Sequence, residues 1–279
     1  MYPIDEKIVK SGRKIVTKSR FLAAKSAVDI GRACLLGYFG KISQIESKAK
    51  AGLVSEADRI CEDLMKNELA RLCPDVEFLG EETSFLENKS NFKSSKKARW
   101  ILDPLDGTTN FIHQFPIFCI SLALEINGEI EIGIIDMPML KQTWTAVRGE
   151  GAYCNDKKIS VSKTAEFSDA LLATGFFAEE NCHLEDQIRI FSHFVALARG
   201  VRRAGAAAYD LALVSSGVFD LFWEKNLKPW DTAAGKILVE EAGGILRTYQ
   251  GHPYSPFADS VVAGYPILVN KFLDYLNQN

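Results

Sequence analysis

Carboxylates at the ends of predicted elements are the side chains best suited to chemistry in this chain of 279 residues. A short apolar strand, Trp100-Ile-Leu102, leads into Asp103-Pro104-Leu-Asp106-Gly107-Thr. Pro104 cannot continue the hydrogen-bond ladder of a strand, and Gly107 permits a tight turn. Asp103 and Asp106 are therefore expected to project from one turn, within a few ångströms of each other.

Two carboxylates placed so closely repel each other unless a cation neutralises them. Acidic oxygens without histidine or cysteine partners select a hard ion, magnesium before zinc. The same letters also suit a solvated turn without any ligand, because Asp-Pro and Asp-Gly are common turn residues. Asp103 and Asp106 alone leave both interpretations open.

Three further acidic positions have the same double interpretation. Asp58 begins a predicted helix, where acids often serve as caps. Glu81-Glu82 follows the predicted strand Phe78-Leu79, and such a pair is commonly exposed. Asp231 follows Trp230 in the first turn of a helix, where the helix dipole favours an acid. Each position alone has a structural explanation. Only the combination of these acidic positions can decide between structural roles and a metal site.

The elements that would position these residues alternate between helices and strands. Apolar residues at helical spacing predict a helix from 21 to 39, and the helix 57–72 is expected to bury Ile60, Leu64, Leu69 and Leu72. Ser55 and Asp58 resemble a capping box at its start, and 88–97 is a polar, lysine-rich surface loop. The other predicted helices are 184–198, 206–215, 231–242 (ended by Gly243-Gly244) and 267–276, and the other predicted strands are 117–126, 129–135, 142–147, 171–174, 201–202, 218–223, 245–248 and 260–263, with hairpin turns at Asn127-Gly128 and Asn155-Asp156.

Composition bounds the class of protein. Hydrophobic residues make up 47% and charged residues 25%, as in globular chains, and the net charge of -3 speaks against binding nucleic acid through the phosphate backbone. No apolar run approaches the ~18 residues that span a bilayer, and the first residues lack an apolar signal core. Six cysteines lack the close spacing of zinc sites, so reduced thiols and a cytoplasmic protein are expected.

Several segments, taken in order, resemble the inositol monophosphatase family, a magnesium-dependent and lithium-sensitive phosphatase superfamily. The resemblance covers nearly the whole chain, with five motifs in register. The matching segments are Lys48 with Leu53-Val-Ser-Glu-Ala-Asp58, Leu79-Gly-Glu81-Glu82, Trp100-Ile-Leu-Asp103-Pro-Leu-Asp106-Gly-Thr-Thr-Asn-Phe111, Arg202-Arg-Ala-Gly205-Ala-Ala-Ala-Tyr-Asp210 and Trp230-Asp231-Thr-Ala-Ala-Gly235.

The resemblance implies two or three Mg²⁺ ions and hydrolysis by a metal-activated water. Glu81, Asp103 and the carbonyl of Leu105 would hold one ion. Asp103, Asp106 and Asp231 would hold a second, and Glu81 would help with a third. Thr108, backed by Asp58, would orient the attacking water and help to deprotonate it.

The resemblance also implies a substrate side. Backbone N–H groups at Gly107-Thr108 and at Gly205-Ala206-Ala207 would meet phosphate oxygens, and Asp106 and Asp231 would border the substrate. The sequence departs from the family at Ala206, where serine or threonine is usual, so one hydroxyl contact is missing. Glu224 matches a glutamate that accepts hydrogen bonds from polyol hydroxyls, although a surface glutamate at a strand end is the structural alternative.

The implied fold is an α/β/α/β/α layered sandwich, a single unit over 1–279 with an N-terminal α+β half of about 1–150 and a C-terminal α/β half of about 151–279. The expected activity is hydrolysis of inositol monophosphate by a homodimer. Relatives hydrolyse histidinol phosphate, 3'-phosphoadenosine nucleotides or fructose bisphosphate, and Thr109-Asn110 favours the inositol branch over the nucleotide enzymes. A regulatory protein that contacts the transcription machinery is the alternative of another class.

Overall fold

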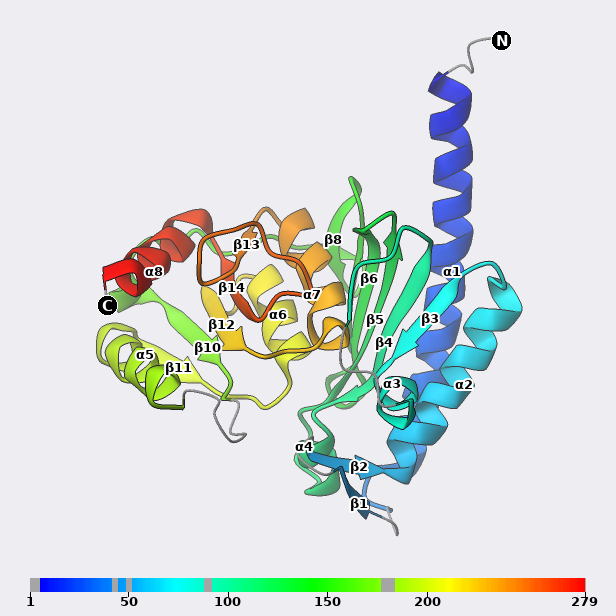
Figure 1. Cartoon of the computed structure of the whole chain (residues 1–279), viewed down its shortest axis with the longest axis horizontal. Coiled ribbons are helices and arrows are strands. Elements are labelled where there is room, and N and C mark those ends of the chain that lie inside the picture. Colours follow the sequence, from blue (N-terminus) through cyan, green and yellow to red (C-terminus); the bar gives the residue numbers. More distant parts are fainter. Residues whose placement is uncertain (1–5, 42–44, 49–51, 88–91, 177–183, 279) are drawn as a thin grey trace.

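The computed structural model describes residues 6–41, 45–48, 52–87, 92–176 and 184–278, with backbone alone for 6–16, 45–48 and 52–55. Within these ranges, a seven-stranded and a five-stranded β-sheet alternate with helices in layers (Figure 1), and two short strands pair in a separate small sheet. Lys48 and Leu53 therefore lie in described strands, β1 (Ile45–Lys48) and β2 (Gly52–Ser55), whose side chains are not described. The capping role predicted for Ser55 likewise lies outside the described side chains.

The larger sheet has the strand order β3-β4-β5-β6-β7-β8-β9 and is antiparallel except for the parallel pair β3–β4. Both of its faces are covered, so β5 is buried at almost every position. The strands are β3 (Glu77–Gly80), β4 (Arg99–Asp106), β5 (Cys119–Ile126), β6 (Glu129–Met137), β7 (Gln142–Val147), β8 (Gly151–Cys154) and β9 (Lys157–Lys158).

The smaller sheet has the order β11-β10-β12-β14-β13, with β11, β10 and β12 parallel and the other pairs antiparallel. Its strands are β10 (Leu171–Thr174), β11 (Gly200–Arg202), β12 (Leu221–Lys225), β13 (Ile245–Arg247) and β14 (Ser260–Gly264). The predicted strand 218–223 therefore begins three residues later, because a turn with Gly217 at a φ of 69° separates it from the preceding helix.

Three apolar cores hold these layers together. The outer face of the large sheet packs against α1 (Glu6–Tyr38) and α2 (Glu56–Leu72). Helices α6 (Ala207–Ser215) and α7 (Pro229–Glu241) fill the space between the sheets. Helices α5 (Leu184–Leu197) and α8 (Pro266–Gln278) cover the far face of the small sheet. The order is α/β/α/β/α, as the family resemblance implied.

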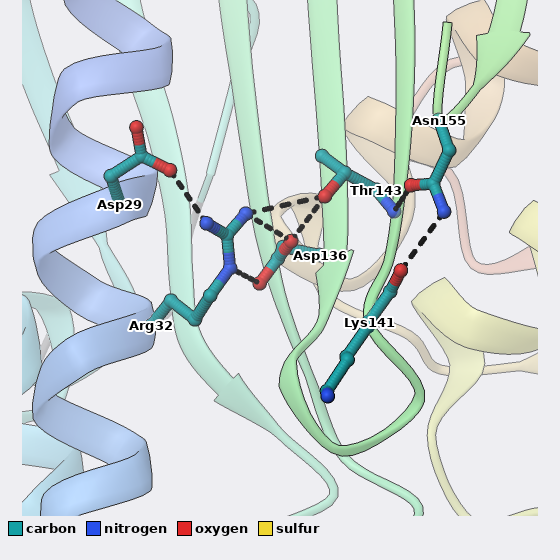
Figure 2. A network of polar contacts seen from close by, with 6 residues as sticks. All are labelled: Asp29, Arg32, Asp136, Lys141, Thr143 and Asn155. Carbon is teal, nitrogen blue, oxygen red and sulfur yellow. Dashed lines mark hydrogen bonds and ion pairs between the residues drawn. The ribbon is translucent and has the colours of Figure 1, made fainter.

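The N-terminal helix begins at Glu6, 15 residues before the predicted start at 21. Apolar periodicity marks only the part of α1 that packs on the sheet, whereas lysine, glutamate and arginine sustain helix without such contacts. Figure 1 shows the first turns of α1 projecting beyond the sheets. On the packed part, Arg32 reaches the large sheet, where its Nη2 lies 2.6 Å from Asp136 Oδ1 of β6 and 3.2 Å from Thr143 Oγ1 of β7 (Figure 2).

The second helix has the predicted bounds within one residue, but its buried face differs. Leu64 and Leu72 are exposed, at 42% and 40% of their surface, whereas Leu69 is buried as expected. Helix α2 is wedged against α1, so the positions that face inward hold mostly smaller or flexible side chains. These are Ala57, Asp58, Cys61, Glu62, Met65 and Leu69.

Candidate active site

The turn with the two aspartates begins inside a strand. Sequence reasoning ended this strand at Asp103 because of Pro104, and that boundary is wrong, since β4 runs on to Asp106. The pairing with β5 shifts at this point, from Asp103 opposite Ser121 to Asp106 opposite Cys119. This bulge accommodates the proline, which lacks an N–H, and it brings both aspartates to the same end of the sheet.

Gly107 then reverses the chain into α4 (Thr108–Ile112). Its φ of 96° is in the left-handed region, as the tight turn required. A Cβ at this position would also lie 3.0 Å from the carbonyl oxygen of Ile117. Thr108 Oγ1 lies 2.9 Å from Asp58 Oδ1 and 3.1 Å from the Leu105 oxygen, so the predicted contact between Thr108 and Asp58 is present.

Glu81 is the first residue of α3 (Glu81–Leu86), directly after β3. The next residue, Glu82, is buried, so the alternative of an exposed acidic pair is wrong. Glu62 of α2, which sequence reasoning missed, fixes this helix start. Its carboxylate accepts hydrogen bonds from the N–H groups of Glu82 and Thr83, at 2.8 and 2.7 Å.

Asp231 comes from α7, across the cleft from β4. Its Oδ2 accepts a hydrogen bond of 2.6 Å from the N–H of Lys228, which closes a capping box at the helix start. Ser121 of β5 donates to the Trp230 carbonyl at 2.7 Å. Trp230 itself is buried, as expected of a core residue. The start of α7 is thereby tied to the large sheet, and Asp231 keeps its place opposite the aspartate turn.

The electrostatics of this region are those of acids without a counter-charge. Burial and the charges of Glu81, Asp106 and Asp231 raise the pKa of Asp103 well above its usual value. Burial above all raises the pKa of Asp106 to about 7. The pKa of Asp231 is also raised well above its usual value, by burial and by Asp106 and Glu81. A bound cation would relieve this repulsion, and an all-oxygen donor set suits Mg²⁺.

The start of α6 faces the same aspartates. The Ala208 N–H donates to Asp106 Oδ2 at 2.7 Å. Ala206 stands at the N-cap without a side-chain cap, so the first turn has no hydroxyl there. Asn110, whose role was not anticipated, donates to the carbonyl oxygens of Ile117 and Ala204, at 2.7 and 2.9 Å. It thereby joins the α4 segment to the loop before α6.

A cleft with a volume of about 160 Å³ lies beside these elements. Six of the predicted site residues line it, namely Asp106, Gly205, Ala206, Ala207, Glu224 and Asp231. Its other lining residues are Thr174, Gly175, Arg203, Asp210 and Leu227. Asp58, Glu81, Asp103, Leu105, Gly107 and Thr108 do not line the cleft itself. Within the described ranges, no three histidine, cysteine or acidic side chains already form a metal cage.

Glu224 lies within β12 and is partly buried. Burial and the charge of Asp106 raise the pKa of its carboxyl to about 8. Gly175 leaves room for this carboxylate, since a Cβ there would come within 2.2 Å of both of its oxygens. Glu224 does lie near the end of β12, as the alternative of a surface glutamate supposed, but it is partly buried and lines the cleft, so it is not a freely exposed residue.

Comparison with known proteins assigns the family. The sequence profile described as the inositol monophosphatase family matches residues 18–278. The chain belongs to this family. Its members are phosphoric monoester hydrolases, so the chain is an enzyme of that class. The prediction from the five sequence motifs is confirmed.

Individual relatives agree with the family assignment. The chain is 39% identical over 231 residues, 82% of this chain and 79% of the relative, to an inositol-1-monophosphatase of Synechocystis. It is 37% identical over 225 residues, 80% and 82% of the two chains, to a protein named Nus factor SuhB in Pseudomonas aeruginosa. Its fold matches an inositol monophosphatase structure from Anabaena with a TM-score of 0.81 at 34% identity, covering 94% and 96% of the two chains.

Two expectations from composition, on membrane spans and on cysteines, are tested only within the described residues. Among the described helices, none is long and apolar enough to cross a membrane. Five of the six cysteines are free thiols, and Cys182 lies outside the described residues, as does Asn88-Lys89-Ser90 of the predicted surface loop. The described part of that loop, 92–97, has no helix or strand, and Lys93, Lys96 and Lys97 are exposed.

Proposed function

We propose that this chain hydrolyses inositol monophosphate to inositol and phosphate in a Mg²⁺-dependent reaction. The observation that carries the proposal is the cluster of Asp103, Asp106 and Asp231. The three carboxylates repel one another; Asp103 is buried, whereas Asp106 and Asp231 are partly buried and line a cleft at the start of α6. The activity carried by the names of the relatives supports the choice of substrate.

Mg²⁺ would lie among the acidic residues. Glu81, Asp103 and the Leu105 carbonyl would hold one ion, and Asp103, Asp106 and Asp231 a second, with Glu81 helping a third. When bound, the metal lowers the pKa of a water and neutralises charge on the leaving oxygen. Glu62 keeps Glu81 in place by capping α3, and Leu105 N–H donates to Asp103 Oδ1 at 2.9 Å, which fixes that carboxylate's rotamer.

Thr108 and Asp58 would prepare the attacking water. The Thr108 hydroxyl donates to the buried Asp58 carboxylate, so a lone pair on its oxygen is left to accept a hydrogen bond from water. The hydrogen bond to Asp58 orients the Thr108 hydroxyl. As the water attacks, it would pass a proton to the Thr108 oxygen, and Thr108 would pass its own proton to Asp58. The proton of the attacking water would thus move through the Thr108 hydroxyl to Asp58.

Phosphate and polyol would be gripped by separate groups. The N–H groups of Gly107 and Thr108 and those at the start of α6, Gly205 to Ala207, donate to phosphate oxygens. Without a hydroxyl at Ala206, the backbone alone does this on the α6 side. Glu224 accepts hydrogen bonds from hydroxyls of the leaving group, because it lines the cleft beyond the aspartates.

Phosphate release by the purified full chain tests this function. We expect release from inositol 1-phosphate with Mg²⁺, none with a chelator, and slower release from fructose 1,6-bisphosphate, histidinol phosphate and 3'-phosphoadenosine nucleotides. A faster rate on one of these three would move the substrate to that branch of the superfamily. No phosphate release from any of them at saturating Mg²⁺ would contradict the enzyme assignment for this cleft.

A second role as a regulatory protein that contacts the transcription machinery is supported by the name of the Pseudomonas aeruginosa relative. The test is pull-down of purified RNA polymerase by the full chain. If the second role is separate from catalysis, Asp103→Asn should lose phosphate release and still bind the polymerase. Binding to nucleic acid directly is not expected, because the chain is acidic overall.

We propose that the enzyme is a lithium-sensitive homodimer in the cytoplasm. Free thiols in the described residues fit a reducing compartment. Helix α5 exposes Leu184, Ile188 and Val195 at helical spacing, which supports association through this face. Light scattering that gives twice the mass of 31.0 kDa for the chain, and a monomer for Ile188→Glu, would fit the proposal, and a wild-type monomer would contradict it.

A further inference from the structure

One acidic side chain in the cleft has no part in the proposed metal site or in the proposed binding of phosphate. Asp210 stands in the first turn of α6, only 2% exposed, and it lines the cleft together with Glu224. Among the described buried side-chain atoms, its Oδ1 is one of two without a hydrogen-bond partner. A buried carboxylate oxygen without a hydrogen-bond donor destabilises the folded chain. A donor brought by the ligand would remove that cost.

The surroundings of Asp210 point to a hydroxyl as this donor. At the start of α6, the other residues that line the cleft are the N-cap Ala206 and Ala207, which carry no polar side-chain atom. The charged neighbours are Glu224, Asp106 and Arg203, of which only Arg203 is a cation. Burial first, then the charges of Glu224 and Asp106, raise the pKa of Asp210 well above its usual value. Asp210 and Glu224 place two carboxyl groups beside the single guanidinium of Arg203. This excess of acidic groups favours an uncharged leaving group that donates hydrogen bonds, and it disfavours a second phosphate.

We propose that Asp210 is a specificity-determining residue that, with Glu224, binds two hydroxyls of the leaving group. The proposal rests on the proposed function and narrows it, since it assigns an uncharged polyol as the leaving group and disfavours a bisphosphate. Ala206, the N-cap of α6, carries no side-chain hydroxyl, so Asp210 is the polar side chain that α6 offers to the substrate among the residues lining the cleft. Asp210 acts on substrate choice, and the aspartates of β4 and α7 act on the phosphate.

Two substrates separate this role from a structural one. Inositol 1-phosphate carries hydroxyls, whereas p-nitrophenyl phosphate has none to bind. Asp210→Ala should lower kcat/KM for inositol 1-phosphate by roughly tenfold to a hundredfold, mainly through KM, and change p-nitrophenyl phosphate less than about threefold. Asp210→Asn keeps the volume and one acceptor, so its loss should be smaller and confined to the same substrate. It also keeps the test available if the alanine variant does not fold.

Asp220 provides a matched control on the same half of the molecule. It is also a buried aspartate, but its carboxylate is satisfied away from the cleft, by Ser162 Oγ and by the Leu171 N–H at 2.6 Å. Asp220→Asn should lower the melting temperature and leave the ratio of the two kcat/KM values unchanged. Asp210→Asn should change that ratio with little effect on melting.

Equal losses on both substrates in the Asp210 variants, or unchanged kcat/KM on both, would overturn the assignment. Failure of the proposed function is distinguishable, because wild type would then release no phosphate from either substrate with Mg²⁺. A loss confined to inositol 1-phosphate, in an enzyme whose wild type hydrolyses both, is the result expected here.

Discussion

The two sides of the cleft are built differently. On one side, Asp103, Asp106 and Asp231 are held by a strand bulge, a left-handed glycine and a capping box, and each is fixed by backbone contacts. On the other side, Glu224 and Asp210 project from β12 and α6 beside Arg203, with one carboxylate oxygen left unpartnered. We propose that the first side holds the metal and the phosphate, and that the second side binds the leaving group. The difference predicts that turnover and substrate choice can be changed separately.

The largest effect should follow from Asp103→Asn. We expect kcat to fall by more than about a hundredfold on every substrate, because loss of residues that merely support metal ligands already costs tenfold to a hundredfold. Removing a charge from the repelling cluster should raise the melting temperature in a chelator. Calorimetric titration with Mg²⁺ and a melting curve check both points. Retained turnover at saturating Mg²⁺ would show that Asp103 is not a shared ligand.

Thr108→Val should have the next largest effect, a loss in kcat of about a hundredfold or more, since positioned proton transfer contributes that much. The valine keeps the shape of threonine but has no hydroxyl, so it can neither accept a hydrogen bond from the water nor donate one to Asp58. Thr108→Ser is the matched control and should retain most of the turnover. An unchanged kcat with a raised Mg²⁺ requirement would assign Thr108 to the metal site instead.

Glu62→Gln tests support of the metal side from outside it. The amide keeps one acceptor but loses the charge and the second acceptor at the start of α3, so Glu81 should be less well placed. We expect Mg²⁺ affinity to fall by roughly tenfold, with substrate preference unchanged. Glu77→Gln, on the exposed part of β3, should leave Mg²⁺ affinity at the wild-type value.

The smallest effect concerns pH. Folding raises the pKa of Asp106 to about 7, above its unfolded value of ~3.9. Between those values the folded chain binds more protons than the unfolded chain, so without metal this group lowers stability as pH rises. Mg²⁺ binds the ionised form and should therefore raise the melting temperature more at pH 7.5 than at pH 5.5. An equal rise at both pH values would contradict an ionised metal site.

Sequence patterns predicted local features better than long-range ones. Asn127-Gly128 and Asn155-Asp156 have positive φ values, as two-residue hairpin turns require, because turn chemistry is local. The buried face of α2 was wrong, since it depends on how α1 approaches, which no spacing in α2 records. The strand end at Asp103 was wrong because pairing with β5 tolerates Pro104 through a bulge.

The same limit applies to the site. Motif spacing located Asp103, Asp106 and Asp231 because their chemistry fixes residue type and neighbours. Glu62, Asn110 and Asp210 were missed as functional residues, since their partners lie far away in the chain and only the fold brings them together. A glutamate one turn after Asp58 on α2 was the one available signal for Glu62, and it is equally typical of a solvated helix face.

The ratio of kcat/KM for inositol 1-phosphate to that for p-nitrophenyl phosphate tests the division of the cleft most directly, measured for wild type, Asp103→Asn and Glu224→Ala. Glu224→Ala should lower this ratio by roughly tenfold to a hundredfold, as expected for loss of a buried hydrogen-bond partner. Asp103→Asn should lower both values and leave the ratio unchanged. A ratio that falls equally in both variants, or in neither, would contradict separate sides for chemistry and substrate choice.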